Sequence, residues 1–441
     1  MKSYGRGIAV LAAVLLLAAE REAPAGPPKA KALVDAWVKA KKDDERAAAW
    51  KAIEANPALE ASEVAPIRDA LMQHFAKRAH KVDGDDWFDE KKDGWRGRYM
   101  TSGKGDKGLV LAMHGGGAGA GDCGQAQSSF SGAVSSVGMR GVYPEVLKKT
   151  EYGWTDPPDT EKWVMTLVRT ARLKWGIDSN HVYLTGHSMG GYGTWTYGSI
   201  YADLFAAGAA FAGAPTMYWQ PNGKDKNAEA VTEGYLPNIR NLPLFVYQSL
   251  DDPNVPSAAN VFAMKELKKL HEADPKGWEH SYEQVDGRKH DFPEKGPLPG
   301  LQWATSHVRD PRPVKITWQP TRTWKTTFYW LRWSDPWICS ELTAAADKAT
   351  NAIAITVKAP RSATPQKTEA ERADRVAKIS VYLDDRLVDM AKEVVVTVDG
   401  KERFRGVPRL SLVTLCRSAE EREDPEYAFA AEAAWDAQTP K

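Results

Sequence analysis

Gly186-His187-Ser188-Met189-Gly190-Gly191 is the stretch that decides the fold of this chain. The residues before it, 182–185, have the pattern of a buried strand, and a helical pattern follows it. A serine with glycines two positions to either side is typical of a sharp strand-to-helix turn that exposes the serine hydroxyl. The motif therefore predicts Ser188 as a nucleophile, in preference to a purely structural glycine turn.

A second glycine-rich motif follows an earlier strand. The apolar run 109–113 leads directly into His114-Gly115-Gly116-Gly117. A glycine loop at the carboxyl end of a strand can direct backbone N–H groups at a developing negative charge. We therefore expect an oxyanion hole formed by Gly116 or Gly117 together with Met189, the residue after the nucleophile. A plain flexible loop is the alternative.

The same region carries a competing pattern. Residues 119–124 match the dinucleotide-binding fingerprint, and Glu145 stands where the ribose-binding acid would be. Gly119 lies several residues past the strand, and we expect no helix to begin there, so a nucleotide site is the weaker interpretation. No cofactor is therefore predicted. No metal is predicted either, because no cysteine and histidine stand at zinc-like spacing.

The base is expected to be a histidine downstream of the serine. His290 lies in the loop 286–291, directly after the predicted strand 279–285. A loop in this place can bring an imidazole ring over the serine hydroxyl. His280 lies inside the strand and His307 on the helix expected after the loop, so His290 is the predicted base.

The acid should follow the predicted strand 242–248. Asp252 is the predicted residue, and its neighbour Asp251 is the alternative. Its task is to hold the imidazole in the correct tautomer and to stabilise the imidazolium as it forms. The chain order serine, aspartate, histidine is that of α/β-hydrolases and differs from the other two well-known triad folds.

Strands and helices alternate around these motifs. Short apolar strands are predicted at 108–113, 141–143, 181–185, 206–212, 242–248 and 279–285, and helices at 159–174 and 258–271. This alternation predicts a mainly parallel, doubly wound α/β sheet covered on both faces. We assign it to residues 91–311, with an N-terminal helical segment at 26–90 and a small C-terminal antiparallel β domain at 312–441.

The first 25 residues have the features of a cleaved signal peptide. Lys2 and Arg6 precede the apolar run 8–19, and Ala23 and Ala25 offer small residues at a cleavage site. The apolar run is shorter than the roughly 20 residues that a membrane-spanning helix requires. We expect a secreted or periplasmic protein without stable membrane insertion after cleavage.

Charge and cysteine content narrow the range of partners. Lys and Arg total 59 and Asp and Glu total 58, a formal net charge of +1, and no block of like charge indicates a nucleic-acid partner. The three cysteines, Cys123, Cys339 and Cys416, allow one disulfide at most, and their spacing defines no pair.

With these motifs in place, residues 95–308 resemble the α/β-hydrolase superfamily. Within it they are most similar to the polyhydroxybutyrate-depolymerase-like, feruloyl-esterase-like and dienelactone-hydrolase-like secreted esterases. The resemblance is carried by residues 114–117, 186–191, 252–256 and 287–290. It implies hydrolysis of a carboxylic ester, free or attached to a polymer, through an acyl-serine intermediate and without a metal.

The resemblance leaves alternatives open. The glycine usual near the start of the acid loop is replaced, since residues 247–250 read Tyr-Gln-Ser-Leu, and this leaves Asp251 and Asp252 as competing acids. Prolyl-oligopeptidase-type peptidases share the same motifs, so a serine peptidase is the second hypothesis. A non-catalytic binding protein on the same fold is the third.

The chain holds 17 tryptophans. An aromatic wall beside the serine would suit aryl or sugar esters, but packing into cores and seams is the favoured interpretation. The tryptophans considered are Trp154, Trp163, Trp195 and Trp219 near the motifs, and Trp318, Trp324, Trp330, Trp333 and Trp337 in the C-terminal region.

Overall fold

The computed structural model describes residues 29–83, 87–90, 95–117, 120–150, 153–155, 158–215, 231–360 and 365–435. The predicted signal peptide at 1–25 and Trp219 lie outside the described residues. The chain forms two compact units, Met1–Asn56 and Pro57–Lys441. None of the described helices is long and apolar enough to span a membrane. The predicted boundaries at 90/91 and 311/312 stay predictions.

The first unit contains two helices, α1 (Ala30–Lys39) and α2 (Asp43–Ala55). Leu33, Val34 and Trp37 lie on one face of α1 and are buried, as their helical spacing predicts. The Trp37 ring contacts that of Trp50 on α2, with ring centres 5.4 Å apart.

The second unit begins with α3 (Ala61–Arg78), whose first turn is closed by a capping box between Glu60 and Glu63. An eight-stranded sheet follows. In the order in which they pair, its strands are β1 (Trp87–Glu90), β2 (Trp95–Ser102), β4 (Arg140–Pro144), β3 (Leu109–Met113), β5 (Val182–His187), β6 (Ala207–Phe211), β7 (Leu244–Ser249) and β8 (His280–Val285).

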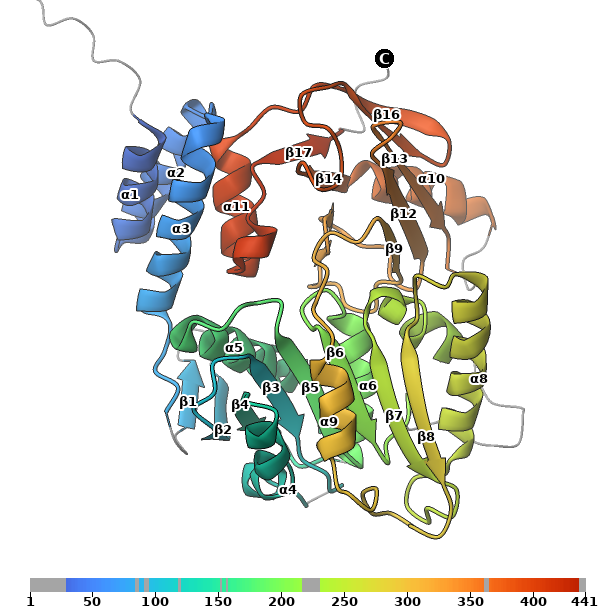
Figure 1. The fold of residues 1–441 in the computed structure, drawn as a ribbon. Helices are drawn as coiled ribbons and strands as arrows, with labels where there is room; N and C mark the ends of the chain where they lie inside the picture. The colour runs from blue at the N-terminus through green and yellow to red at the C-terminus, as the bar shows by residue number, and fades with distance from the viewer. Residues whose placement is uncertain are drawn as a thin grey trace, which may run out of the picture. The chain divides into compact units, whose positions relative to one another are not determined.

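The sheet is parallel from β4 to β8, and β1 and β2 are added antiparallel at one edge. Both of its faces are covered. On one face lie α4 (Cys123–Ser136) and α9 (Leu298–Thr305). On the other lie α5 (Pro158–Trp175), α6 (Met189–Ile200) and α8 (Ala258–Ala273). This confirms the predicted mainly parallel, doubly wound sheet (Figure 1).

The expectation that no helix begins after the glycine loop is wrong. Helix α4 begins at Cys123, and the side chain of Asp122 accepts a hydrogen bond from the N–H of Gln125 at 2.8 Å. This is an N-cap, which satisfies a backbone donor that the first turn leaves free. The buried stripe of α4 consists mainly of small residues around Phe130, so its helical periodicity is weak in the sequence.

The C-terminal region forms two further sheets. One pairs β10 (Thr327–Phe328), β11 (Leu331–Trp333), β14 (Ile379–Leu383) and β17 (Ala431–Ala434), all antiparallel. The other pairs β16 (Lys401–Gly406), β15 (Val394–Val398), β13 (Ala352–Lys358), β12 (Glu341–Asp347) and β9 (Lys315–Trp318).

One strand pair departs from the antiparallel prediction: β13 and β15 run parallel. The chain between them passes through α10 (Pro365–Ala377) and through β14 of the other sheet, so it re-enters in the same direction. The predicted hairpin β15–β16 is confirmed. Its turn residues Asp399 and Gly400 both have positive φ, 52° and 76°, as a tight two-residue turn requires.

Most of the tryptophans pack into cores. Trp154, Trp163 and Trp195 are at most 2% exposed and lie in the core between the sheet and its helices. In the C-terminal region the core interpretation holds for Trp318, Trp330, Trp333 and Trp337, whereas Trp324 is 41% exposed.

The C-terminal region joins the large sheet, through the segment 424–427 between α11 (Leu412–Arg422) and β17, at the edge where the central strands begin. Tyr427 donates to the main-chain oxygen of Asp203, which precedes β6, at 2.6 Å. Arg309 donates to Ser179, which precedes β5, and pairs with Asp424, both at 3.0 Å. The carboxyl ends of β5 to β8 point the other way (Figure 1), so the C-terminal sheets do not cover the elbow serine.

Candidate active site

Ser188 occupies the turn between β5 and α6. Its φ of 59° and ψ of −122° lie in a region that L-residues rarely adopt, and its N–H donates to the carbonyl of Phe211 at 2.9 Å. A Cβ atom on Gly186 would lie 2.2 Å from the carbonyl oxygen of Gly190, and one on Gly190 would lie 2.1 Å from that of Met113. The two glycines are therefore required by close backbone approach.

The structure brings the predicted serine, histidine and aspartate together. Ser188 Oγ lies 2.8 Å from His290 Nε2, and His290 Nδ1 lies 2.8 Å from Asp252 Oδ2. Because an ionised carboxylate is an acceptor only, Nδ1–H donates to Asp252 and Nε2 accepts from the serine hydroxyl. In this tautomer the imidazole is ready to take the hydroxyl proton.

Asp252 is held from two sides. Its side chain is fully buried, and its Oδ1 accepts backbone hydrogen bonds from Asn254 at 2.8 Å and Val255 at 2.9 Å. These donors occupy one carboxylate oxygen and leave Oδ2 directed at His290. The carboxylate is thus fixed in orientation before any reaction begins.

Asp251 has a different set of partners. Its Oδ1 accepts from the Ser249 hydroxyl at 2.5 Å and from the N–H of Lys289 at 3.0 Å, and these hydrogen bonds lower its pKa. Ser249 Oγ also accepts from the N–H of Arg288 at 3.2 Å. Asp251 therefore ties the loop after β7 to the loop that carries His290. Ser249 lies in the stretch 247–250, where the sequence analysis found the expected glycine replaced, and its hydroxyl takes part in this link.

His187, which the sequence analysis did not assign to the site, packs beside His290. The two ring centres are 5.0 Å apart, and the Phe292 ring lies 4.4 Å from His187 on another side. Burial, and secondarily the nearby His290, lower the pKa of His187 to about 4. Among the described residues its buried Nε2 has no hydrogen-bond partner. His187 is therefore a neutral ring that limits the movement of His290.

The glycine loop passes directly beside the serine. A Cβ atom on Gly115 would lie 3.2 Å from Ser188 Cβ, so Gly115 is a close neighbour that the sequence analysis did not single out. Gly116 has a φ of 113°, and nothing lies within 4 Å of the Cβ position of Gly117. Met189 is the first residue of α6. The roles of Gly116, Gly117 and Met189 as oxyanion donors stay predictions.

His114 fixes the shape of this loop. Its Nε2 accepts from the N–H of Val146 at 3.3 Å, so Nδ1 carries the proton and donates to the carbonyl of Gly115 at 2.7 Å. Burial lowers the pKa of His114, which keeps the ring neutral. The indole N–H of Trp154 donates to the His114 carbonyl at 3.2 Å.

The residues of the competing nucleotide pattern do not suit a phosphate. The carboxylate of Asp122 already caps the N-terminus of α4, and Glu145 approaches the N–H of Cys123 at 3.4 Å. A pyrophosphate needs these N–H groups and is repelled by both carboxylates. Gly119 lies outside the described residues. Within the described ranges, no group of three or more His, Cys, Asp or Glu side chains is arranged to hold a metal ion.

The three cysteines are free thiols. Burial raises the pKa of Cys123 to about 11 and that of Cys416 to about 12, so both stay protonated at neutral pH. Cys339 is exposed.

No protein-family model matches the chain. Over 52 residues it is 44% identical to feruloyl esterase B of Talaromyces stipitatus, a match that spans 12% of this chain and 14% of that protein. Among solved structures, a thermostable esterase covers 51% of this chain at 22% identity and a TM-score of 0.39, and 62% of the esterase is matched. Est1E from Butyrivibrio proteoclasticus covers 51% of this chain at 13% identity, with 96% of Est1E matched and a TM-score of 0.36.

Ser188 follows β5, Asp252 follows β7 and His290 follows β8. Together with the strand order, this is the arrangement in which α/β-hydrolases place a nucleophile, an acid and a base. All three side chains lie at the carboxyl edge of the parallel strands, where open α/β sheets place their sites. The Pro57–Lys441 unit therefore has the α/β-hydrolase fold at its centre.

Proposed function

We propose that the protein is a serine hydrolase that cleaves carboxylic esters through an acyl intermediate on Ser188. His290 accepts the hydroxyl proton as Ser188 Oγ attacks the ester carbonyl carbon, and the carbonyl oxygen becomes an oxyanion. Backbone N–H groups of Met189 and of the glycine loop stabilise that charge. The C–O bond to the alcohol then breaks, and the alcohol leaves with the proton from His290.

The second half of the reaction repeats these roles with water. His290 removes a proton from a water molecule, whose oxygen attacks the acyl carbon and displaces Ser188. The serine oxygen regains the proton from His290, and the carboxylic acid is released. Asp252 stabilises the imidazolium in both halves.

The observation that carries the proposal is the unbroken chain of two 2.8 Å hydrogen bonds from Ser188 through His290 to Asp252. The strained serine backbone supports it, since such strain is retained where function needs it. The short match to a feruloyl esterase agrees with an ester as substrate. Export to the periplasm or outside the cell, implied by residues 1–25, is part of the proposal.

The test compares wild type with Ser188→Ala on p-nitrophenyl esters of graded acyl length, with feruloyl and acetyl-sugar esters, and with peptide anilides. We expect ester turnover to fall by at least ~1,000-fold in Ser188→Ala. Ser199→Ala is the matched control, because Ser199 lies on the same helix and bonds the carbonyl of Thr196. We expect it to keep the wild-type rate within about threefold.

Near wild-type ester turnover by Ser188→Ala would overturn the assignment of the nucleophile. Cleavage of anilides without cleavage of any ester would instead establish the peptidase alternative.

A further inference from the structure

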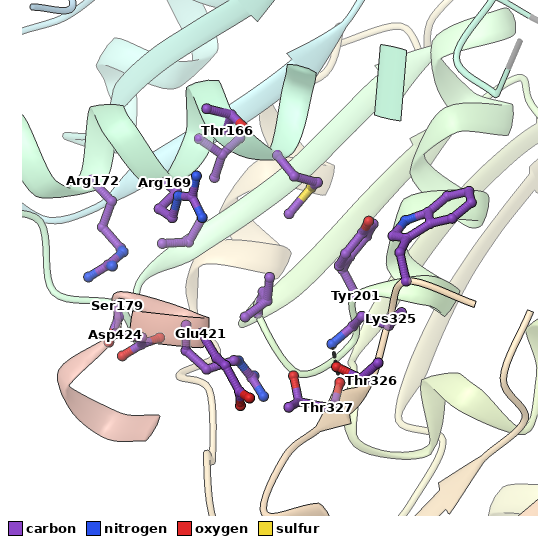
Figure 2. A pocket seen from close by; sticks show the side chains of 16 residues that line it. Thr166, Arg169, Arg172, Ser179, Tyr201, Lys325, Thr326, Thr327, Glu421 and Asp424 are labelled. Carbon is purple, nitrogen blue, oxygen red and sulfur yellow. Dashed lines mark hydrogen bonds between the residues drawn. The ribbon is translucent and has the colours of Figure 1, made fainter. Parts of the chain in front are cut away.

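A cavity of about 250 Å³ lies between α5 and the C-terminal region, where residues 324–327 and the end of α11 (Leu412–Arg422) line it, remote from Ser188. Val182, the first residue of β5, lines it, whereas Ser188 follows the last residue of that strand. Six residues of extended strand span roughly 20 Å, so the cavity and the serine are at opposite edges of the sheet. Figure 2 shows Arg169 and Arg172 of α5 on one side and Lys325 on the other.

Arg172 is the unusual group in this cavity. It is 8% exposed, and it points from α5 toward Ser179 and Asp424 (Figure 2). Within the described residues its one hydrogen-bond acceptor is the main-chain oxygen of Glu423, and no carboxylate lies within 4.0 Å of its guanidinium. A buried guanidinium without a counter-ion is costly, because it has lost water and gained no opposite charge.

The nearest carboxylate is already engaged. Asp424 is paired with Arg309 at 3.0 Å, with both side chains at most 4% exposed. Glu423 pairs through one oxygen with Arg78 at 2.6 Å and through the other with Arg169 at 3.2 Å. Asp424 and Glu423 attract Arg172 only from beyond ion-pair distance, and each already pairs with another arginine.

On the opposite side of the cavity two cations share one buried carboxylate, while Glu421, which also lines the cavity, pairs with Arg332. Asp203 is shared by Lys325 at 2.8 Å and Arg422 at 2.5 Å. Burial lowers the pKa of Lys325 to about 8, so this surplus charge can be relieved by loss of a proton from Lys325. The guanidinium of Arg172 cannot lose its charge in this way, because an arginine stays protonated at all ordinary pH values. Among the described residues that line the cavity, Arg172 is therefore a buried cation that forms no ion pair within 4.0 Å.

Part of the cavity wall is apolar and is formed by Met165, Val168, Val182 and Leu204. Uncharged polar side chains, those of Thr166, Thr326 and Thr327, also line the cavity. An inorganic ion would leave this wall without contacts, whereas a planar carboxylate with a short apolar body would satisfy both sides. Carboxylates match the fork of N–H donors on a guanidinium.

We propose that this cavity binds a small organic monocarboxylate, with its carboxylate on Arg172 and its apolar body against Met165 and Leu204. The site is separate from the Ser188 site, and its occupation neutralises the buried guanidinium. Ligand binding therefore also stabilises the joint between the large sheet and the C-terminal sheets.

Isothermal titration calorimetry of the full chain with benzoate, benzamide and inorganic phosphate tests this site. We expect benzoate to bind the wild type and Ser188→Ala with equal affinity, and benzamide to bind at least about tenfold more weakly because it lacks the charge. Inorganic phosphate should bind more weakly than benzoate, because it makes no apolar contacts.

Two variants remove the site from different sides. Arg172→Met removes the charge and keeps a side chain of similar length, and we expect it to weaken benzoate binding by about tenfold to a hundredfold. Met165→Trp fills the cavity from its apolar wall and leaves every charge in place, and we expect the same loss. Thermal unfolding of each variant shows whether it is folded. If Arg172→Met does not fold, the benzoate affinity of Met165→Trp alone tests the proposal.

Three results would overturn the inference: benzoate that does not bind the wild type, benzoate binding that both variants retain, or phosphate binding that is tighter than benzoate binding. Loss of benzoate binding in Ser188→Ala would place the ligand at the elbow serine instead. A failure of ester hydrolysis alone leaves the inference intact, because the two sites share no residue.

Discussion

Asp251 and Asp252 are adjacent in the sequence but have different partners. Asp252 is buried and bonds His290, whereas Asp251 bonds Ser249 and the N–H of Lys289. The two neighbouring carboxylates therefore have different structural roles in the site. Asp252 orients the imidazole ring, and Asp251 holds the loop on which that ring stands.

Asp252→Asn and Asp251→Asn form a matched pair. In Asp252→Asn an amide N–H would face His290 Nδ1 and favour the wrong tautomer, so we expect kcat for ester hydrolysis to fall by roughly 10⁴-fold. An asparagine at 251 still accepts from Ser249 and Lys289, so we expect a loss of less than about tenfold. Steady-state kinetics at pH 8 distinguish the two, and equal losses would contradict the division of roles.

His187 makes the fold sensitive to acid. Its folded-state pKa of about 4 lies below the ordinary histidine value of about 6.5, so between these values the unfolded chain binds the proton more tightly. Stability is therefore lost as the pH falls through this window. Relative to His187→Gln, we expect wild type to lose about 2 kcal/mol more unfolding free energy between pH 7 and 4.5. Urea unfolding at both pH values measures this, and parallel losses would contradict it.

The proximity of Ser188 and His290 could be predicted from the sequence, because each residue lies in a short motif with a clear strand before it. Asp252 was the predicted acid, but Asp251 stayed open as the alternative, because the backbone hydrogen bonds from Asn254 and Val255 to Asp252 are encoded by no pattern of residue types. The contact of His187 with His290 was missed because it joins the end of β5 to a loop about 100 residues farther along the chain.

At the scale of single elements, the elbow depends on glycines at positions 186 and 190. The β5–α6 turn lies so close to β3 that a Cβ atom on Gly190 would overlap the carbonyl of Met113. Helix α4 also contains a glycine, Gly132, but nothing lies within 4 Å of its Cβ position. The two positions therefore separate a required glycine from a replaceable one.

We expect Gly190→Ala to lower the free energy of unfolding by about 3 kcal/mol, because the clash is with backbone atoms that cannot rotate away. Gly132→Ala should instead raise it by about 0.5–1 kcal/mol, because alanine favours a helix interior. Denaturant unfolding checks both. If both substitutions changed the free energy of unfolding by similar amounts in the same direction, the close backbone approach at Gly190 would not be what requires a glycine there.

The strands of the sheet could be predicted because parallel strands buried on both faces give continuous apolar runs, as β3 shows with every residue buried. Helix α4 could not, because alanines and Cys123 form most of its buried face and give a weak helical signal. The parallel pairing of β13 with β15 was also missed, since it depends on the path of the chain through the other sheet.

At the scale of the whole molecule, charged residues join the C-terminal sheets to the amino edge of the large sheet. Arg309 and Asp424 lie 115 positions apart in the sequence and form a buried ion pair at this joint. Contacts of this separation leave no local pattern, so the sequence predicted a C-terminal domain without indicating where it docks.

Arg309→Met leaves the Asp424 carboxylate buried without its partner, so we expect the free energy of unfolding to fall by about 3–5 kcal/mol. The matched control is Arg405→Met, whose pairs with Glu393 and Glu402 are exposed and should change stability by less than about 1 kcal/mol. The kcat of folded Arg309→Met should stay within about twofold of wild type, because the joint lies far from Ser188. A large kcat loss with unchanged stability would contradict this arrangement.

The most direct test of the account is covalent labelling of the full chain with a fluorophosphonate probe, read out by peptide mass spectrometry. Ser188 Oγ would attack phosphorus and displace fluoride only if its proton can pass to His290. We expect one label per chain, on Ser188, and labelling at least ~100-fold slower in His290→Ala. A label on another residue, or labelling of Ser188→Ala at the wild-type rate, would contradict it.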